Sequence, residues 1–322
     1  MSASGGTKAI VAALVANLGI AITKFIAWLL TSSSSMLAES IHSVADSGNQ
    51  ALLLLGGKRA RRDATPQHPF GYGRERYIYA FIVSIVLFSV GGLFALYEGY
   101  HKLSHPSPIT AWHWVPVTVL VVAIGLESFS FRTAIVESNA VRGETSWTDF
   151  VRRAKAPELP VVLLEDLGAL VGLVLALIGV SLTLITGDGM WDGLGTIAIG
   201  ILLVAIAIIL AIETKSLLLG ESATADDVRK IEAALLAGDG TAPGVDRIIH
   251  MKTLHLGPEE LLVAAKIAVP GDESAADVAR SIDAAEQRIR AAVPIATAIY
   301  LEPDIDRARE GATATPIAGD AG

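Results

Sequence analysis

The chain of 322 residues contains no cysteine, which excludes disulfide bonds and metal sites built from thiolates. It also lacks an HExxH motif and any pattern that pairs a nucleophile with a base, so we expect no enzyme activity. The short polar start, residues 1–8, carries no small-residue cleavage pattern, and a cleavable signal peptide is therefore not expected.

Charged residues make up only 18% of the chain and are unevenly distributed. Residues 1–220 hold 15 basic and 15 acidic side chains, whereas residues 221–322 hold 10 and 18, so the net charge of −8 lies in the last third. A nucleic-acid-binding domain needs a basic face, which excludes that function for this third. Its acidic surface is either simply well solvated or relieved of self-repulsion by bound cations.

Apolar residues, 52% of the total, gather in six stretches, each long enough to cross a bilayer core of about 30 Å. The predicted transmembrane helices cover residues 9–30, 36–56, 77–99, 113–136, 159–186 and 193–213. Lys and Arg gather in the loops after the second and fourth stretches, while the loop after the third has only Lys102. By the positive-inside rule both termini are cytoplasmic, and we expect a multi-pass protein of the cell (inner) membrane.

The last third is predicted to fold as a small cytoplasmic α+β domain. Helical periodicity and β-branched runs follow one another there in the order α-β-β-α-β, over residues 224–237, 245–254, 260–269, 275–293 and 296–302. We therefore divide the chain into a transmembrane domain, the α+β domain and a disordered tail, covering residues 1–215, 216–306 and 307–322.

Ionisable side chains lie inside the apolar stretches, where a charge costs several kcal/mol to insert. His42 and Asp46, four residues apart, project from one face of the second predicted helix, and Asp166 lies in the fifth. Such groups usually face a partner or a water-filled path. Because imidazole and carboxylate groups are ligands of divalent transition metals, these residues predict a metal-transport site.

A depth count supports a shared site. At a rise of about 1.5 Å per residue, Asp46 lies roughly 15 Å from the outer face and Asp166 roughly 14 Å from the inner face. Two helices thus offer carboxylates at one level of the membrane, as a common metal ion requires. The alternative is a buried hydrogen-bonded pair that only joins the two helices.

Two further acidic residues accompany these three. Glu39 lies on the same helical stripe as His42 and Asp46, nearer the outer face, and could line the exit path. Glu165 precedes Asp166 and projects about 100° away from it, so the two cannot face one ion with ideal geometry.

Four other polar residues, in or next to the apolar stretches, are interpreted mainly as structural. Glu127 is assigned a structural or vestibule role, with an entry ligand, a proton carrier or a partner of Arg132 as alternatives. Asn17 is interpreted as a packing amide, and Lys24 as a snorkelling or paired lysine. Asp192 is expected to place its charge favourably at the N-terminus of the sixth helix.

Four segments resemble the cation diffusion facilitator family. They are SMLAESIHSVADSGNQALLLLG, HPFGYGRER, WDGLGTIAIGILL and ETKSLLLGES. The resemblance covers nearly the whole chain and implies six transmembrane helices, cytoplasmic termini and a dimerising cytoplasmic domain of ferredoxin-like or metallochaperone-like fold. It also implies a homodimer that exports divalent cations, most often zinc, in exchange for protons.

In that family two ligands on each of the second and fifth helices, four residues apart, form the transport site. The resemblance assigns His42, Asp46 and Asp166 as metal ligands, but the fourth position falls on Val162, which cannot bind a metal. Glu165 is the expected substitute if the helix rotates or unwinds locally. A His/Asp/Asp/Glu set is harder than a site with two histidines, which admits manganese, iron or cobalt besides zinc.

The resemblance also implies sites outside the membrane, which are incomplete in this chain. His68 matches a ligand of a loop site, and His250 and Glu302 match ligands of the last domain. Side chains that do not match family ligands stand at the neighbouring positions, Thr65, Tyr72, Ala265 and Tyr300. A lone His on a strand is more often satisfied by a local hydrogen bond, so we do not expect a cytoplasmic metal site.

The sequence thus predicts a homodimeric, proton-coupled exporter of divalent metal ions that works by alternating access among membrane lipids. No cofactor is expected beyond the transported cation, with zinc as the first choice. Neutral His42 could exchange a proton for the metal, because the ordinary pKa of imidazole, about 6.5, is near physiological pH. The alternative is a non-transporting metal sensor or membrane scaffold on the same fold, which Val162 makes plausible.

Overall fold

The computed structural model describes residues 3–110, 112–237, 245, 247–269 and 273–304. The chain divides after Gly220 into two compact units, each with a hydrophobic core of its own. The predicted disordered tail, residues 307–322, lies outside the described residues.

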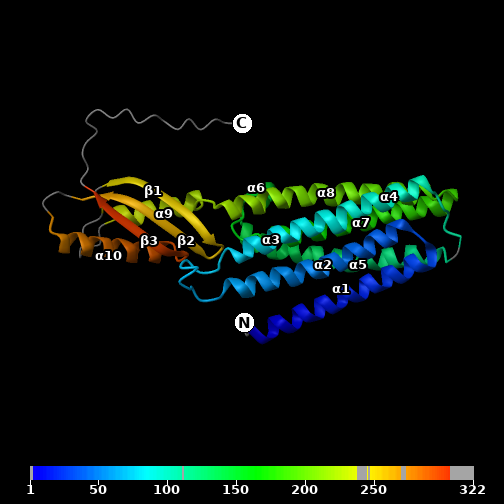
Figure 1. Cartoon of the computed structure of the whole chain (residues 1–322), viewed down its shortest axis with the longest axis horizontal. Helices are drawn as coiled ribbons and strands as arrows, with labels where there is room; N and C mark the ends of the chain where they lie inside the picture. The colour runs from blue at the N-terminus through cyan, green and yellow to red at the C-terminus, as the bar shows by residue number, and fades with distance from the viewer. Residues whose placement is uncertain (1–2, 111, 238–244, 246, 270–272, 305–322) are drawn as a thin grey trace, which may run out of the picture. The chain divides into compact units, whose positions relative to one another are not determined.

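Within the described residues, long helices that run alongside one another make up the first unit (Figure 1). They are α1 (Ala3–Thr31), α2 (Ser34–Ala60), α3 (Glu75–Val86) continued by the π-helical η1 (Leu87–Leu93) and α4 (Phe94–Ser104), α5 (Trp114–Arg142), α7 (Glu158–Thr186) and α8 (Met190–Leu219). Each of the six predicted apolar stretches falls on one of these helical segments to within one residue, so their helical structure is confirmed.

Four of these segments are long and apolar enough to cross a membrane, namely Glu75–Ser104, Trp114–Arg142, Glu158–Thr186 and Met190–Leu219. The apolar portion of α1 that could be assessed, Asn17–Thr31, is shorter. The sequence of α2 is rich in Ser and also holds Glu, His, Asp and Asn, which lower its average hydropathy. Membrane crossing by α1 and α2 therefore stays a prediction.

Helices α4 and α8 approach each other closely through glycine. A Cβ atom on Gly99 of α4 would lie 2.7 Å from Cγ1 of Ile197 in α8, and one on Gly200 of α8 would lie 2.8 Å from the backbone nitrogen of Leu96. Larger residues would push the helices apart, and small residues are common where membrane helices meet. On its other side α8 packs against α7, which in turn contacts α2 and α5. This arrangement brings α2, α5 and α7 together around the candidate site.

The sequence analysis missed a short helix, α6 (Trp147–Arg153). Oγ of Ser146 accepts a hydrogen bond from the backbone nitrogen of Asp149 at 3.1 Å and so caps the helix. A serine followed three residues later by an acidic residue was the sequence signal that could have located it. Arg152 and Arg153, two of the basic residues counted above in the loop after the fourth apolar stretch, lie at its end.

The second unit has the predicted order α-β-β-α-β (Figure 1). Its elements are α9 (Ala225–Leu236), β1 (Arg247–Gly257), β2 (Glu260–Ala268), α10 (Ala275–Ala292) and β3 (Ala296–Asp304). The sheet order is β1-β2-β3, in which β1 and β2 form the predicted hairpin and β3 pairs parallel to β2 after the α10 crossover. Alternate residues of β2, such as Val263, join Ile231 of α9 and Ile289 of α10 in one core.

Candidate functional site

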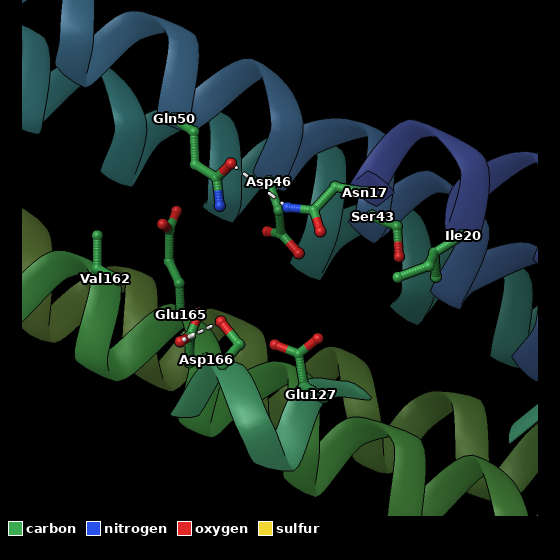
Figure 2. A pocket seen from close by; sticks show the side chains of 10 residues that line it. Asn17, Ile20, Ser43, Asp46, Gln50, Glu127, Val162, Glu165 and Asp166 are labelled. Carbon is green, nitrogen blue, oxygen red and sulfur yellow. Dashed lines mark hydrogen bonds between the residues drawn. The ribbon is translucent and has the colours of Figure 1, made fainter. Parts of the chain in front are cut away.

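A small cavity lies among α1, α2, α5 and α7 (Figure 2). Its solvent-accessible volume is about 30 Å³, which is room for about two water molecules. Four carboxylates line it: Asp46 of α2, Glu127 of α5, and Glu165 and Asp166 of α7. Three helices thus bring acidic side chains from distant parts of the sequence to one cavity.

Asp46 faces the acidic side chains of the other helices across this cavity (Figure 2). Glu165 and Asp166 both line it although they are consecutive, and α7 is helical without interruption from Glu158 to Thr186. The rotation or local unwinding that was expected to bring Glu165 to the site is therefore not needed. Val162, four residues before Asp166, lines the cavity as well.

Neutral polar side chains hold two of the carboxylates. Ser130 of α5 donates a hydrogen bond to Oδ2 of Asp166 at 3.0 Å, and Asn49 of α2 donates one to Oε1 of Glu165 at 2.6 Å. The second bond joins α2 to α7 directly. The sequence analysis missed both partners, although Ser130 stands three residues after Glu127 and so faces the same side of α5.

The amide side chains of two further residues line the cavity between α1 and α2. Nδ2 of Asn17 lies 3.3 Å from Oε1 of Gln50, and both residues line the cavity. The interpretation of Asn17 as a packing amide is confirmed. Gln50 was missed, although it follows Asp46 by four residues and therefore lies on the same face of α2.

His42 contacts Asp46 but is not among the described residues that line the cavity. Its Nε2 lies 3.5 Å from Oδ2 of Asp46, and the residue is only 1% exposed. On the other side of the ring, a Cβ atom on Gly91 of η1 would lie 3.7 Å from Nδ1. The imidazole thus lies between Asp46 and the π-helical turn.

Glu39 is fully buried and pairs with Lys24 of α1 instead of lining the cavity. Nζ of Lys24 donates to Oε2 of Glu39 at 3.0 Å and to Oγ of Ser43 at 2.9 Å. Of the two interpretations of Lys24, the paired one is confirmed. Ser43 lines the cavity, so the ammonium group is separated from it by one side chain.

Asp192 does more than place its charge in the first turn of its own helix, α8. Its carboxylate accepts hydrogen bonds from the backbone nitrogens of Ser34 and Ser35 at 2.7 and 3.2 Å and from Oγ of Ser33 at 2.9 Å. It therefore caps the N-terminus of α2, whose first backbone N–H groups have no partner within the helix. The sequence offers no signal for a contact across 158 residues.

His68 lies in the connection between α2 and α3 and is exposed. Its backbone nitrogen donates to Oγ1 of Thr65 at 3.1 Å, and its ring stacks at a tilt on Tyr72 with centroids 4.7 Å apart. Oγ1 of Thr65 lies 3.3 Å from the hydroxyl of Tyr72. Thr65 and Tyr72, which replace family ligands in this loop, thus contact His68 and each other.

In the second unit a lysine stands between the two candidate ligands. His250 of β1 and Glu302 of β3 both pair in register with Lys266 of β2. Nζ of Lys266 lies 2.9 Å from Oε1 of Glu302 and 3.2 Å from Oδ2 of Asp304. The pKa of Lys266 is accordingly raised, chiefly by its hydrogen bonds to these two carboxylates. An ammonium group therefore holds the carboxylate that a metal would need.

Across the described part of the chain, no three His, Asp or Glu side chains gather closely enough to hold one metal ion. The cavity carboxylates instead stand on opposite walls, on α2, α5 and α7. Chemically, such a cavity attracts a divalent cation, which would draw Asp46 toward Glu165 and Asp166 on binding. Oxygen ligands of this kind favour hard or borderline metals over soft ones.

A family profile described as the cation efflux transmembrane domain matches residues 10–219, about two thirds of the chain. The chain is 33% identical over 274 residues to the proton-coupled zinc antiporter SLC30A9, mitochondrial, of Xenopus laevis, covering 84% of this chain and 48% of the relative. For the human protein of that name the identity is 32% over 269 residues, covering 83% and 46%. Metal tolerance protein C4 of Arabidopsis thaliana is 30% identical over 262 residues, covering 81% and 56%. The chain thus spans about half the length of these relatives.

Proposed function

The chain belongs to the cation diffusion facilitator family, and we propose that it exports divalent metal cations, zinc foremost, in exchange for protons. The observation that carries this proposal is the single cavity onto which α2, α5 and α7 bring four carboxylates. Ionisable groups at membrane depth mark substrate pathways more often than structural contacts. The names of the relatives, which refer to zinc and protons, support the choice of cargo and of counter-ion.

In this proposal Asp46 and Asp166 hold the cation from opposite walls, and Glu165 takes the place that Val162 leaves vacant. Ser130 and Asn49 orient the carboxylates of Asp166 and Glu165 before the cation arrives. Since these ligands are mainly oxygens, manganese, iron and cobalt compete with zinc more effectively than at a site with two histidines. No enzymatic step is needed.

Exchange follows from charge. Four carboxylates in one small cavity repel each other when no metal is present, and protons are the simplest cations that relieve this repulsion. Entry of a metal ion releases these protons, and alternating access of the cavity to the two sides converts the competition into antiport. We further propose six transmembrane helices, cytoplasmic termini, a homodimer and a cell (inner) membrane location.

The test is flux into proteoliposomes that contain the purified full-length chain and a trapped metal indicator. Zinc, manganese, iron and cobalt are compared, each with and without a pH gradient. We expect saturable zinc flux that the gradient accelerates, and no flux in Asp46→Ala or Asp166→Ala, because a desolvated cation needs both charges. Glu137→Ala, which removes an exposed carboxylate of the same α5 helix that carries Glu127, is the matched control and should transport normally.

Two results would contradict the proposal. Normal flux in both aspartate variants would place the transport site elsewhere. Tight zinc binding by the wild-type chain without any flux would favour the alternative, a metal sensor or membrane scaffold on the same fold. Size-exclusion chromatography of each variant shows whether the protein is still folded and dimeric.

A further inference from the structure

One face of α2 carries a column of buried polar atoms that no described residue satisfies. Glu39, His42, Asp46 and Asn49 follow at spacings of three, four and three residues and therefore share this face. The atoms without a hydrogen bond are Oε1 of Glu39, both ring nitrogens of His42, Oδ1 of Asp46 and Oδ1 of Asn49. Buried groups of this kind are rare in native proteins and often mark the place of a water or an ion.

The column extends beyond the cavity. Asp46 lines the cavity, whereas Glu39 stands seven residues nearer the N-terminus of α2, or about 10 Å further along the helix axis. On α7, which runs the other way, Gly172 stands seven residues beyond Glu165, and a Cβ atom there would lie 2.9 Å from Oε1 of Glu39. Because α2 and α7 are antiparallel and both offsets are seven residues, Glu39 and Gly172 lie at one level, beyond the carboxylate cavity.

Glycines, which have no side chain, lie near both candidate ligands at this level. A Cβ atom on Gly172 of α7 would lie 2.9 Å from the free oxygen of Glu39. One on Gly91 of η1 would lie 3.7 Å from Nδ1 of His42, with methyl groups of Leu203 and Leu87 nearer, at 3.3 and 3.5 Å. The two ligands are three residues apart on α2, so both can reach one position beside the helix. Imidazole and carboxylate together suit the same divalent metals as the cavity does.

A cation already stands here. Nζ of Lys24 lies 3.0 Å from Oε2 of Glu39, with the two residues 3% and 0% exposed. The same ammonium group donates to Ser43, whose side chain lines the cavity. A buried ion pair contributes little net stability compared with apolar residues of similar size, so its presence in an apolar bundle needs another reason.

We propose that Glu39 and His42 form a second cation site, next to the cavity on the side toward the N-terminus of α2, which the Lys24 ammonium occupies until a transported metal ion displaces it. This inference rests on the proposed transport function and adds a second stop to the path. The lysine acts as a tethered counter-ion: its flexible four-carbon stem lets it yield without leaving the protein. It neutralises Glu39 between transport events. It also weakens the binding of the metal ion at Glu39, so that the ion can be released.

The experiment counts cobalt ions bound per chain to the full-length protein in detergent, by equilibrium dialysis and metal analysis, and records the visible cobalt spectrum. Lys24→Gln keeps a hydrogen-bond donor but removes the charge. At a free cobalt concentration that just fills the cavity of the wild type, we expect it to bind one more cobalt ion per chain, because no ammonium group has to be displaced, with a spectral band that is lost when His42→Gln is added. Lys24→Gln/Glu39→Gln and Lys24→Arg should both return to the wild-type count.

Lys102→Gln is the matched control. Lys102 is also buried, but its Nζ donates only to the backbone oxygen of Ser32 and to Oγ of Ser107 in the described structure. The control should bind as many ions as the wild type. A wild-type count in Lys24→Gln, or an extra ion that persists in Lys24→Gln/Glu39→Gln, would overturn the second site. If the wild type itself binds no cobalt, the proposed transport function fails instead.

A second variant keeps the proposal testable if Lys24→Gln does not fold. Glu39→Gln releases the ammonium group from its carboxylate while Ser43, beside the cavity, remains its acceptor. We expect the affinity of the cavity for cobalt to fall several-fold, since an unneutralised positive charge then lies close by. An unchanged affinity in a folded Glu39→Gln protein would show that Lys24 and Glu39 serve only to join α1 and α2.

Discussion

Nε2 of His42 lies 3.5 Å from Oδ2 of Asp46, and of these two described residues Asp46 alone lines the cavity. His42 and Asp46, with which the prediction of a metal site from the sequence began, therefore have different surroundings. Asp46 faces the place where the cation would bind. His42 lies beside Asp46 and against η1, where the second cation site is proposed.

This difference makes the two residues unequal in transport. We expect His42→Gln to lower the initial zinc flux by about 10–100-fold, the range typical when a residue next to a metal ligand is lost. Asp46→Asn should abolish flux. The order of preference among zinc, manganese and cobalt should stay the same in His42→Gln, whereas a changed order would show that the imidazole binds the cavity metal directly.

The two glutamates of the cavity are also expected to differ. Glu165 stands beside Asp166 on α7 and is held by Asn49 across the α2–α7 contact, whereas Glu127 approaches from α5. Glu165→Gln should therefore lower flux at least tenfold (about 1.4 kcal/mol) and Glu127→Gln less. Initial rates in proteoliposomes decide the order, and the reverse order would move the fourth ligand to α5.

Val162 offers a test of metal selectivity because its side chain already lines the cavity. Val162→His adds an imidazole four residues before Asp166, on the same face of α7. Since imidazole is a softer donor than carboxylate, the ratio of zinc to manganese flux should rise. Leu167→His, at a partly exposed position of the same helix, is the control and should leave this ratio unchanged. An unchanged ratio in Val162→His as well would mean that position 162 does not reach the ion.

Asp192 is expected to matter for stability. Asp192→Asn replaces a charged acceptor of the N–H groups at the start of α2 by an amide whose NH₂ group would face those donors. Hydrogen bonds to a charged group contribute about 1.5–3 kcal/mol, so the melting temperature in detergent should fall by several degrees. Asp63→Asn, at an exposed loop position, should melt like the wild type. A wild-type melting temperature in Asp192→Asn would show that the cap contributes little.

The second unit supplies a prediction about metal removal. Lys266 already neutralises Glu302, and His250 pairs in register with the same lysine. A purified 221–322 fragment should therefore be dimeric in chelator at physiological salt, where screening weakens the repulsion between two copies of charge −8. Added zinc should shift its melting temperature by no more than about 2 °C, because stabilisation follows how tightly a ligand binds the folded form.

Sedimentation of this fragment measures its oligomeric state, and calorimetry measures its melting temperature with and without zinc. A monomer in chelator, or a large stabilisation that saturates at one or two zinc ions per chain, would contradict the expectation. Other side chains, such as His255 with Glu259 or Glu260, would then have to form the metal site. Burial and the neighbouring Glu259 raise the pKa of Glu260, so zinc binding through that carboxylate should weaken as the pH falls.

The sequence predicted those features that depend on local pattern. Apolar runs located the long helices, and alternating periodicities gave the order of elements in the second unit. Counting residues from the ends of two helices placed Asp46 and Asp166 at one level, and both line one cavity. Each of these inferences needs only the rise per residue and the direction of the chain.

The sequence did not predict which way each side chain on α2 points. The rotation of that helix is set by contacts with α1, α7 and η1, and by the cap from Asp192, all distant in the chain. These contacts turn His42 toward Gly91 and pair Glu39 with Lys24. The same packing lets Glu165 and Asp166 share a cavity, because a space bounded by three helices accepts side chains from a wide arc of α7.

The size of the cavity has a consequence for the kinetics of any ion that enters it. A divalent cation held directly by carboxylates of two walls of so small a cavity exchanges part of its shell of about six waters for these oxygens, so binding requires the loss of hydration water. Magnesium releases its waters reluctantly, even though it prefers oxygen ligands. We therefore expect magnesium to enter such a cavity slowly, because its dehydration is slow, even where the oxygen ligands suit it.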